Sequence, residues 1–375
     1  GLLYLCGATA WYQGLLALLP AWSLAAGLSV RLFLARSQPS MLPRMEYKDA
    51  LPPEQATLVV VPALITDAES LRGVIRQLEV HMLATRMEHC YYGVLGDFPD
   101  GKQAQRPGEG ELLRLAKSLV EELNQKYPSP TPLFYYLHRR RTYQKADGLY
   151  MGWERKRGAL CQLVTLLTQG DASPFALLTH PLPQGIRYCL TLDADTVLPP
   201  GALAKLVGAM AHPLHAPEWD DQGVVRKGYG ILAPRMAALP RGAAKSGFAW
   251  VASGDSGLDS YFPLCGEFYQ DVFGAGIFGG KGIFHVEAFA RALPRWIPEN
   301  QVLSHDLLEG CFLRAGLVED VTLYDCEPAG FIAWWKRQHR WTRGDWQLLP
   351  YLGDGVRDGA GVLRDNPLSS FSRYK

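Results

Sequence analysis

The sequence has 375 residues, of which 48% are hydrophobic and 20% charged, with 38 glycines and 26 prolines. This composition excludes a disordered or low-complexity chain, and the length suits one large α/β domain or two smaller ones. Lysine and arginine number 38 against 37 aspartates and glutamates, and a net charge of +1 gives no support for a protein that mainly neutralises nucleic-acid phosphates. The seven cysteines form no CxxC pair, which disfavours a zinc ribbon or a secreted disulfide scaffold and favours reduced thiols in the cytosol.

The N-terminal segment is predicted to associate with a membrane. Residues 1–30 contain no acidic or basic side chain and no histidine, and the first charge is Arg31. Because about 20 apolar residues span the hydrocarbon core, residues 1–20 are long enough to cross it, and a second short helix after Pro20 would lie at the interface. The basic residues that follow predict that the rest of the chain faces the cytoplasm. The lack of a charged n-region argues against a signal peptide, and a buried core helix is the alternative.

Strands and helices are expected to alternate in the next part of the chain. The β-branched run TLVVVPAL at 57–64 is typical of a strand buried on both faces. Further elements are predicted in chain order as a helix at 67–86, a strand at 91–98, a helix at 111–127, a strand at 132–138, a helix at 150–168 and a strand at 186–195. This alternation predicts a mainly parallel α/β sheet flanked by helices, with ligands bound beyond the carboxyl ends of the strands. The glycine-rich residues 240–285 are expected to form an irregular, substrate-contacting insertion.

Acidic residues end two of the predicted strands, Asp97 on one and the pair Asp193 and Asp195 on another. Two close carboxylates repel each other unless a cation lies beside them. Since Mg²⁺ takes one or two carboxylates together with phosphate oxygens of a substrate, the pair predicts a site for a metal and a nucleotide diphosphate. A turn that uses aspartate as a local hydrogen-bonding residue is the alternative.

A second acidic motif, Ser304-His305-Asp306, opens a predicted helix. Asp306 is a candidate general base, kept ionised by the positive end of the helix dipole and placed about 2.6–3.2 Å from an acceptor hydroxyl. The alternative is that Ser304 or Asp306 simply caps the helix.

A basic and aromatic motif runs from Arg337 to Trp346, on a helix predicted to begin near Phe331. One interpretation is an amphipathic helix lying in the membrane interface. A second adds Arg340 as a ligand for pyrophosphate and Trp341 as a flat platform for a sugar ring, and the two interpretations are compatible.

The glycine-rich stretch 273–282 contains Gly280 and Lys281 and does not match the GxGxxG pattern of dinucleotide sites. Glycines at this density let a backbone approach a ligand closely. A sugar acceptor crossing this backbone and a plain flexible loop both fit the pattern.

The order of these motifs resembles the processive, inverting family 2 glycosyltransferases, which have the GT-A fold and carry a nucleotide-contacting Asp, a DxD pair, a catalytic Asp and a [Q/R]xxRW motif. More narrowly, the sequence from about residue 21 onward resembles the transferase domain of cyclic β-1,2-glucan synthases. The segments that carry this resemblance are VVVPALIT, GDFPD, WERKRGAL, TLDADT, GKGIFHVEAF, PENQVLSHDLLEG and RQHRWTRGDWQLL. The sequence departs from the usual motifs at Arg337, which replaces glutamine, at His305, which precedes the catalytic acid, and at Phe284-His285, where an aromatic residue and Asp are usual.

The resemblance implies a role for each motif residue. The nucleotide-sugar site would consist of Asp97 at the uridine, Lys156, Arg157 and Arg340 at the diphosphate, and Asp193 and Asp195 at UDP and a Mg²⁺ or Mn²⁺ ion. The acceptor site would consist of Trp341, Gly280, Lys281, Arg337 and Gln338. Asp306 would deprotonate the acceptor hydroxyl.

The resemblance further implies a transferase that uses UDP-glucose to extend a β-glucan, most simply β-1,2-linked, at the bacterial inner membrane with its catalytic domain in the cytoplasm. Residues 1–36 would be membrane helices, 37–350 the GT-A domain and 351–375 a connector toward further membrane helices and a carbohydrate-phosphorylase domain of a longer chain. Inner-membrane lipid is an expected partner and nucleic acid is not. The rival hypotheses are a cellulose, chitin or hyaluronan type of synthase, a two-carboxylate glycosidase and a non-catalytic membrane scaffold.

Overall fold

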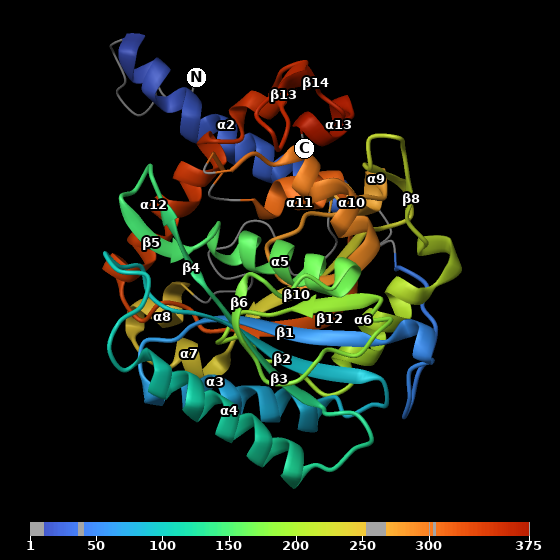
Figure 1. Cartoon of the computed structure of the whole chain (residues 1–375). Coiled ribbons are helices and arrows are strands. Elements are labelled where there is room, and N and C mark those ends of the chain that lie inside the picture. The colour runs from blue at the N-terminus through green and yellow to red at the C-terminus, as the bar shows by residue number, and fades with distance from the viewer. Residues whose placement is uncertain (1–10, 37–40, 253–267, 300, 303–304, 375) are drawn as a thin grey trace.

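The computed structural model describes residues 11–36, 41–252, 268–299, 301–302 and 305–374. Residues 1–10 of the predicted membrane span, the candidate cap Ser304 and residues 253–267 of the glycine-rich region lie outside the described residues. The described chain is organised around one large sheet with helices on both faces (Figure 1).

The central sheet has eight strands in the order β12-β10-β11-β7-β1-β2-β3-β6. Its strands, in chain order, are β1 Thr57–Leu64, β2 Cys90–Asp97, β3 Phe134–Arg139, β6 Phe175–Leu178, β7 Tyr188–Thr191, β10 Ile231–Ala238, β11 Gly282–His285 and β12 Ala315–Asp325. All are parallel except β11, which runs antiparallel between β7 and β10, and β6, which is antiparallel to β3. The predicted class, a mainly parallel α/β sheet flanked by helices, is confirmed.

Helices cover both faces of this sheet, and Figure 1 shows the layers. The helices are α2 Trp11–Leu34, α3 Ala68–Ala84, α4 Glu109–Lys126, α5 Arg155–Gln169, α6 Ala202–Ala211, α7 Pro240–Ala243, α8 Gly247–Ala252, α9 Phe268–Phe273, α10 Val286–Trp296, α11 Asp306–Phe312, α12 Phe331–Trp346 and α13 Ser370–Tyr374, with short 3-10 turns η1 Pro53–Gln55, η2 Pro213–His215 and η3 Leu349–Leu352. Side chains of α3, α4 and α6 form one buried cluster, and those of α5, α10 and α11 form the other. Three two-stranded sheets lie outside the central one: β4 Arg141–Gln144 with β5 Leu149–Gly152, β8 Glu218–Trp219 with β9 Val225–Lys227, and β13 Gly355–Arg357 with β14 Leu363–Asp365.

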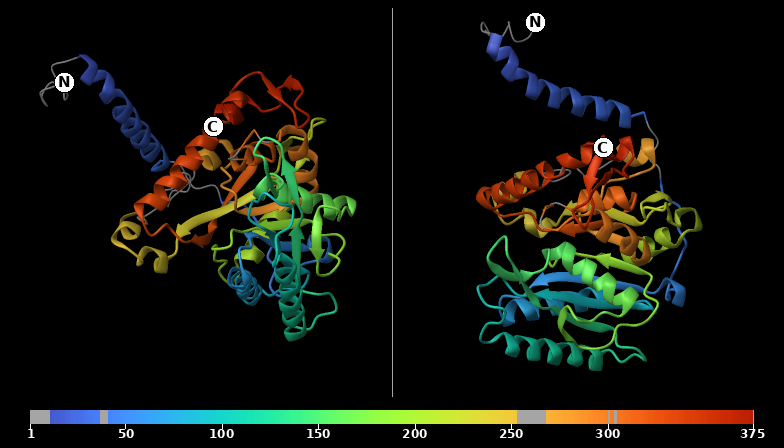
Figure 2. Two further views of the ribbon diagram at one scale, coloured as in Figure 1. Left: turned by 60° about the vertical axis from the view of Figure 1, so that its left-hand side comes forward. Right: turned by 45° about the horizontal axis from the view of Figure 1, so that its top comes forward.

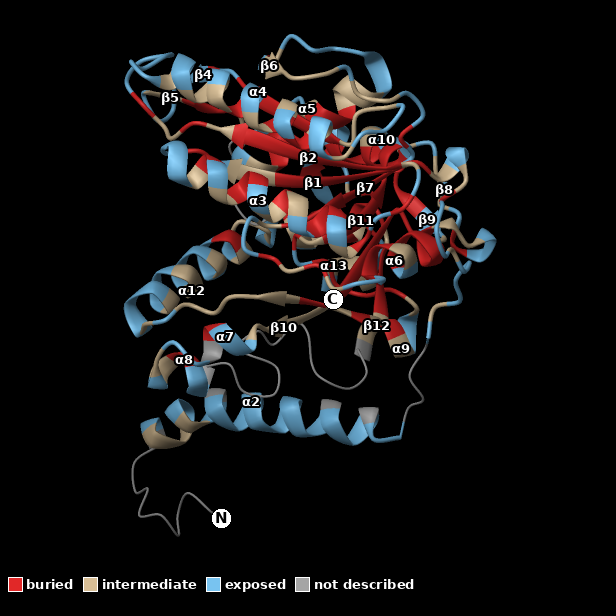
Figure 3. Cartoon of the chain, turned by 90° about the horizontal axis from the view of Figure 1, so that it is seen from below, coloured by how far each residue is buried: buried red, intermediate tan, exposed pale blue. Residues whose placement is uncertain are grey.

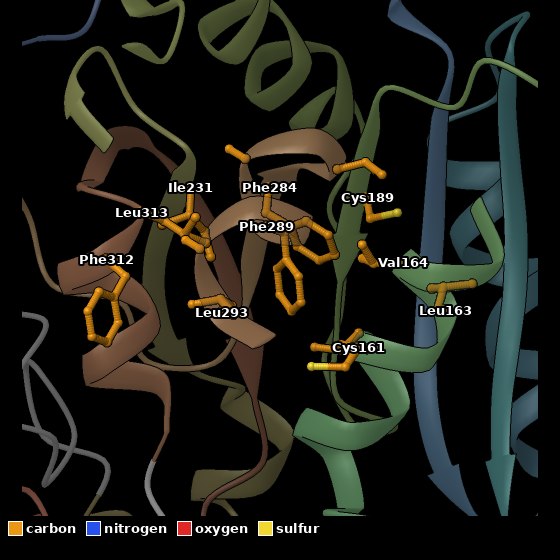
Figure 4. Close-up of a cluster of buried hydrophobic side chains, with 14 of the residues drawn as sticks. Cys161, Leu163, Val164, Cys189, Ile231, Phe284, Phe289, Leu293, Phe312 and Leu313 are labelled. Carbon is orange, nitrogen blue, oxygen red and sulfur yellow. The ribbon is translucent and has the colours of Figure 1, made fainter. Parts of the chain in front are cut away.

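Strand β1 is apolar throughout because its side chains contribute to both buried clusters. Leu58 and Val60 belong to the cluster with α5 and α10, whereas Val59 and Val61 belong to the cluster with α3 and α4. Successive side chains of a strand point to opposite faces, so a strand covered on both sides must be apolar throughout. Figure 4 shows the first cluster, in which side chains of α5 meet those of β11 and α10. The buried strands stand out at the centre of Figure 3.

The predicted strand at 57–64 coincides with β1, and the other strands and helices predicted up to residue 195 are confirmed with shifted ends. The helix expected from residue 150 begins only at Arg155, because the preceding residues pair as β5 with β4. The strand expected to reach residue 195 stops at Thr191, because the chain then turns: the N–H of Thr196 donates to the carbonyl of Asp193 at 3.1 Å, and the N–H of Asp193 donates to Thr196 Oγ1 at 3.3 Å. The aspartate pair therefore sits in a turn as well as at the sheet edge.

The N-terminal helix α2 is continuous and passes through Pro20, so the expected division into a span and a separate interfacial helix is wrong. A proline removes only one helical hydrogen bond, and the apolar sequence continues on both sides of it. The segment Tyr12–Phe33 is long and apolar enough to cross a membrane by length and composition, and none of it is buried against the rest of the chain. Figure 2 shows α2 standing apart from the sheet, which argues against a buried core helix.

The glycine-rich region 240–285 is more regular than expected. Its described parts contain α7, α8, α9 and β11, so an irregular insertion is the wrong description for them. Gly282 begins β11 where the strand passes close to β10: its φ is +154°, and a Cβ there would lie 2.3 Å from the carbonyl oxygen of Leu232. This glycine therefore serves strand packing.

The C-terminal residues from 351 onward pack on the sheet domain. Tyr351, Val356 and Leu368 are buried in the same cluster as Trp296, and the Tyr351 hydroxyl donates to the Trp296 carbonyl at 3.1 Å. That residues 351–375 connect to further membrane helices stays a prediction.

Candidate functional site

A cleft of about 820 Å³ opens at the carboxyl edge of the parallel strands. Its polar and aromatic lining comes from the ends of β7 and β12, the start of β11 and the helices α5, α11 and α12, and includes Glu154, Arg155, Lys156, Asp193, Asp195, Lys281, His305, Asp306, Asp325, Arg337, Arg340, Trp341 and Arg343. Asp193, Asp195 and Asp306 thus line one cavity, although more than a hundred residues separate the pair from the single acid. Most of the predicted site residues meet here.

Asp193 is held by two lysines. The Nζ of Lys156 lies 2.5 Å from Asp193 Oδ1, and the Nζ of Lys281 lies 3.1 Å from Oδ2. Lys156 also donates to the carbonyl of Gly280 at 2.8 Å, which ties the first turn of α5 to the glycine-rich stretch. Burial raises the pKa of Asp193, but the two lysine charges outweigh it and lower the pKa to about 2. This carboxylate is therefore ionised and neutralised on both oxygens.

Asp195 has a different environment. Its side chain is exposed in the cleft and forms no ion pair with any residue that the structure describes. Partial burial and the negative charges of Asp325 and Asp193 raise the pKa of its carboxyl group. A cation beside Asp195 would relieve this repulsion.

Asp325 is a cleft residue that the sequence analysis missed. It ends β12, accepts a hydrogen bond from Thr196 Oγ1 at 2.6 Å and lies 2.5 Å from the Nζ of Lys281. Burial lowers the pKa of Lys281, but the charges of Asp193 and Asp325 outweigh it and raise the pKa, so the ammonium stays charged. The sequence did offer a signal, because Asp325, like Asp97, is an acid that follows a run of strand-forming residues.

Two predicted donor-site residues do not line the cleft. The Arg157 side chain is buried, pairs with Glu154 at 2.7 Å and donates to the carbonyl of Ile297 at 3.2 Å. Asp97, at the end of β2, is bound by Arg139, whose Nε donates to Oδ1 at 2.7 Å and whose second nitrogen contacts Oδ2. The predicted contact of Asp97 with uridine stays a prediction, and its observed partner is the buried guanidinium.

Arg139 also shapes the turn that precedes α5. It donates to the carbonyls of Trp153 and Arg155 at 2.8 and 2.9 Å. Between them Glu154 has φ +52°, and Arg155 has φ +48°, a conformation that side chains with a Cβ rarely adopt. Gly158 is required here, since a Cβ would lie 1.8 Å from the Trp153 carbonyl oxygen. This turn brings Lys156, in the first turn of α5, into contact with Asp193, which follows the end of β7.

Asp306 is the first residue of α11 and is half-buried in the cleft wall. The backbone of Gly280 packs against its carboxylate so closely that a Cβ on this glycine, which has φ +85°, would lie 2.7 Å from Asp306 Oδ2. Oδ1 has no hydrogen-bond partner among the described residues and lies 3.4 Å from His305 Nδ1. Oδ1 is buried, whereas the exposed part of the side chain lines the cleft, where the carboxylate can meet the proton of an acceptor hydroxyl.

Helix α12 supplies the basic and aromatic side of the cleft. Arg340, Trp341 and Arg343 line it. The guanidinium of Arg337 pairs with Glu327 and lies 4.8 Å from the centre of the Trp341 ring, so it fixes the indole by a cation–π contact. The helix predicted near Phe331 is confirmed.

The predicted acceptor residues fall into three groups. Trp341 and Arg337 line the cleft, and Gly280 contacts the candidate base. Lys281 lies in the cleft but binds two carboxylates. Gln338 is half-buried on α12 and is not among the residues that line the cleft.

The carboxylates at the sheet edge fit a hard divalent cation. Asp195 offers an unpaired, electrostatically strained carboxylate, and Asp193 offers oxygens now bound by lysine, an arrangement suited to an ion that takes most of its ligands from phosphate and water. A tighter group exists elsewhere: one atom each of His305, Asp306 and Glu309 lies within 4.8 Å of the others. There the hydrogen bond of 2.8 Å between His305 Nδ1 and Glu309 Oε1 satisfies two of the three groups without an ion.

Together the fold and site define a mainly parallel α/β protein with a cleft lined by acids and cations at the carboxyl edge of its sheet. No protein-family model matches the chain. Over 342 residues it is 42% identical to the cyclic beta-(1,2)-glucan synthase NdvB of Rhizobium meliloti (strain 1021), a match that covers 90% of this chain and 12% of that much longer protein. The resemblance predicted from the sequence is thereby confirmed: the chain is related to a segment of a cyclic β-(1,2)-glucan synthase.

A structural comparison gives a weaker likeness. The crystal structure of the galactosyltransferase LgtC, in complex with donor and acceptor sugar analogues, aligns with 77% of this chain and 95% of that chain at a TM-score of 0.32 and 10% identity. At this TM-score the likeness carries no argument about the site.

Proposed function

We propose that this chain is a glycosyltransferase domain that transfers glucose from UDP-glucose to a growing β-glucan, with β-1,2 linkage. The observation that supports this most is the cleft itself, where Asp193, Asp195 and Asp306 meet the α12 residues Arg340 and Trp341. The relationship to a cyclic β-(1,2)-glucan synthase supports the proposed substrate class. A glycosidase needs only two carboxylates, whereas this cleft also carries many cations suited to a diphosphate.

The donor would bind with its diphosphate near the cations of the cleft. Lys156 comes from α5, and Arg340 and Arg343 come from α12, two helices that both line the cavity. Guanidinium and ammonium groups bind phosphate oxygens strongly, and in a partly buried cleft they stabilise the charge that grows on the leaving UDP. Mg²⁺ or Mn²⁺, held by Asp195 with Asp193, would supply further charge stabilisation.

Asp306 would act as the general base. Its carboxylate, which lines the cleft, accepts the proton of the acceptor hydroxyl while the hydroxyl oxygen forms a bond to the anomeric carbon and the bond from this carbon to UDP breaks. One displacement inverts the anomeric centre, so α-linked UDP-glucose yields a β-linkage. The indole of Trp341, fixed by Arg337, offers a flat surface for an acceptor sugar.

We also propose a membrane location, with α2 as the anchor and residues 37–350 as a cytoplasmic transferase domain. Arg31 lies in the last turn of the apolar helix, and Arg36 and Arg44 follow it, which supports a cytoplasmic side for the residues after α2. On the sheet domain, Trp250 of α8 and Phe331, Ile332 and Trp335 of α12 each expose more than half of their surface. The residues 351–375 would lead to further domains of a longer protein, as in the relative of which this chain spans 12%.

The test of the transfer reaction uses the 375-residue chain in detergent with labelled UDP-glucose, Mg²⁺ and a β-1,2-glucan oligosaccharide, followed by methylation analysis of the product. We expect 2-linked glucose. A 4-linked product would favour a cellulose type of synthase, incorporation only from UDP-N-acetylglucosamine would favour a chitin or hyaluronan type, and hydrolysis of glucan without nucleotide would favour a glycosidase. If UDP fails to raise the melting temperature, the result would favour a non-catalytic membrane scaffold.

A further inference from the structure

A buried carboxylate, Glu309, lies directly behind the candidate base. Its side chain is 1% exposed, and it is not among the residues that line the cleft. It stands one helical turn after His305 on α11, and Oε1 lies 2.8 Å from His305 Nδ1. A buried carboxylate without a positive partner costs several kcal/mol, so Glu309 requires a charge beside it.

His305 is the group placed to supply this charge. It lines the cleft, and its Nδ1 faces both Glu309 and, at 3.4 Å, Asp306 Oδ1. Burial lowers the pKa of His305, but the charges of Glu309 and Asp306 outweigh it and raise the pKa above its usual value. From the facing helix α5, Lys156 opposes this with its positive charge, and the neutral thiol of Cys161 lies near Glu309.

The carboxylate of Asp306 is thereby confined from two sides. The imidazole of His305 lies on one side, and the backbone of Gly280 packs against Oδ2 on the other. Neither contact is a short hydrogen bond, and the exposed part of the side chain lines the cleft, so the carboxylate stays oriented and able to accept a proton. Glu309 does not line the cleft, but its carboxylate lies within 4.8 Å of that of Asp306, so its own negative charge opposes the effect of the histidine on Asp306.

We propose that Glu309 and His305 form a positioning pair for Asp306, in which Glu309 holds His305 as imidazolium and the imidazolium keeps Asp306 ionised and oriented toward the acceptor. This inference rests on the proposed function for the role of Asp306, but the pairing itself does not. The pairing also gives a function to His305, which stands directly before the proposed general base in this sequence.

The first test is the pH dependence of glucose transfer in the Glu309→Gln variant. Glutamine keeps the shape and a hydrogen-bonding oxygen but removes the charge, so His305 becomes neutral near pH 7. The loss of the imidazolium charge 3.4 Å from Asp306 Oδ1 should shift the acid limb of the rate profile upward by about one pH unit, after allowance for the loss of the Glu309 charge, which acts in the opposite sense. The turnover number at pH 6 should fall, with UDP affinity unchanged.

Glu287→Gln is the matched control. Glu287 forms an i,i+4 pair with Arg291 on α10, as Glu309 does with His305 on α11, but it is exposed and outside the cleft. Its variant should keep the wild-type pH profile. An unshifted acid limb in Glu309→Gln, with UDP binding intact, would overturn the proposal.

A second measurement separates this proposal from the proposed function. The ring nitrogens of ¹⁵N-histidine report protonation directly, and His305→Gln assigns the signal of this residue. We expect a doubly protonated ring at pH 7 in the wild type and a titration midpoint lower by at least about one unit in Glu309→Gln. A neutral wild-type ring, or an imidazolium signal that depends on added or chelated metal, refutes the pairing whether or not the chain transfers glucose.

Discussion

Lys281 and Asp325 form an ion pair across the cleft, with the Nζ of the lysine 2.5 Å from Oδ2 of the aspartate. The pair joins the start of β11 to the end of β12, two strands that are not neighbours in the sheet. The same ammonium lies 3.1 Å from Asp193, so one lysine neutralises carboxylates from two strand ends. Lys281 therefore links the two strand ends by its charge.

These ion pairs predict opposite effects of Asp325→Asn on metal and on nucleotide. Removing one negative charge lowers the affinity for Mg²⁺ about tenfold, because charges at such distances interact by about 1–4 kcal/mol. It also frees Lys281 from one partner, so UDP without metal should bind more tightly than in the wild type. Isothermal titration calorimetry with and without Mg²⁺ measures both effects. Asp320→Asn, on the surface of the same strand beside Arg44, is the control and should change neither.

Asp306→Asn should lower the rate of glucose transfer by at least about 100-fold, because an amide cannot accept the proton of the acceptor hydroxyl. UDP affinity should stay nearly unchanged, since the residue lies on the acceptor side of the proposed displacement. Transfer kinetics measure the fall in rate, and calorimetry of the same preparation measures the UDP affinity. A loss of nucleotide affinity that matches the loss of rate would contradict the role of base.

Gly280→Ala should slow transfer about 10- to 100-fold by pushing the Asp306 carboxylate out of place, since small displacements of reacting groups have effects of this size. Gly108→Ala is the matched control, because both glycines have φ +85° but Gly108 has open space around its Cβ position. Both variants should lose roughly 1–2 kcal/mol of stability from backbone strain, measured by chemical denaturation. Equal activity in the two variants would show that the close contact is unimportant.

As the pH falls, metal-dependent UDP binding should begin to weaken at a higher pH than it would if Asp195 had the usual pKa of an aspartate. The pKa of Asp195 lies above its usual value of 3.8, so protonation competes with the metal as the pH falls toward that value from above. Calorimetry from pH 7 to pH 4 with Mg²⁺ should show this loss, and binding measured in chelator should be less sensitive. In Asp195→Asn the Mg²⁺ dependence should disappear, and an unchanged dependence would count against a metal at this aspartate.

The sequence by itself determined the alternation of strands and helices, because burial on both faces requires continuous apolar runs such as the one in β1. It also marked Asp193, Asp195 and Asp306, since an acid at a strand or helix end is visible without coordinates, and it identified the relationship to cyclic β-(1,2)-glucan synthases.

Only the tertiary structure decided which charges meet. Asp325 and Lys281 are far apart in the chain, and they pair because an antiparallel β11 is inserted beside β10. Arg157 turned inward while its neighbour Lys156 turned to the cleft, a choice set by the left-handed turn that Arg139 holds before α5. Such pairings depend on distance and burial in three dimensions, since electrostatic energy falls with separation in space and not along the sequence.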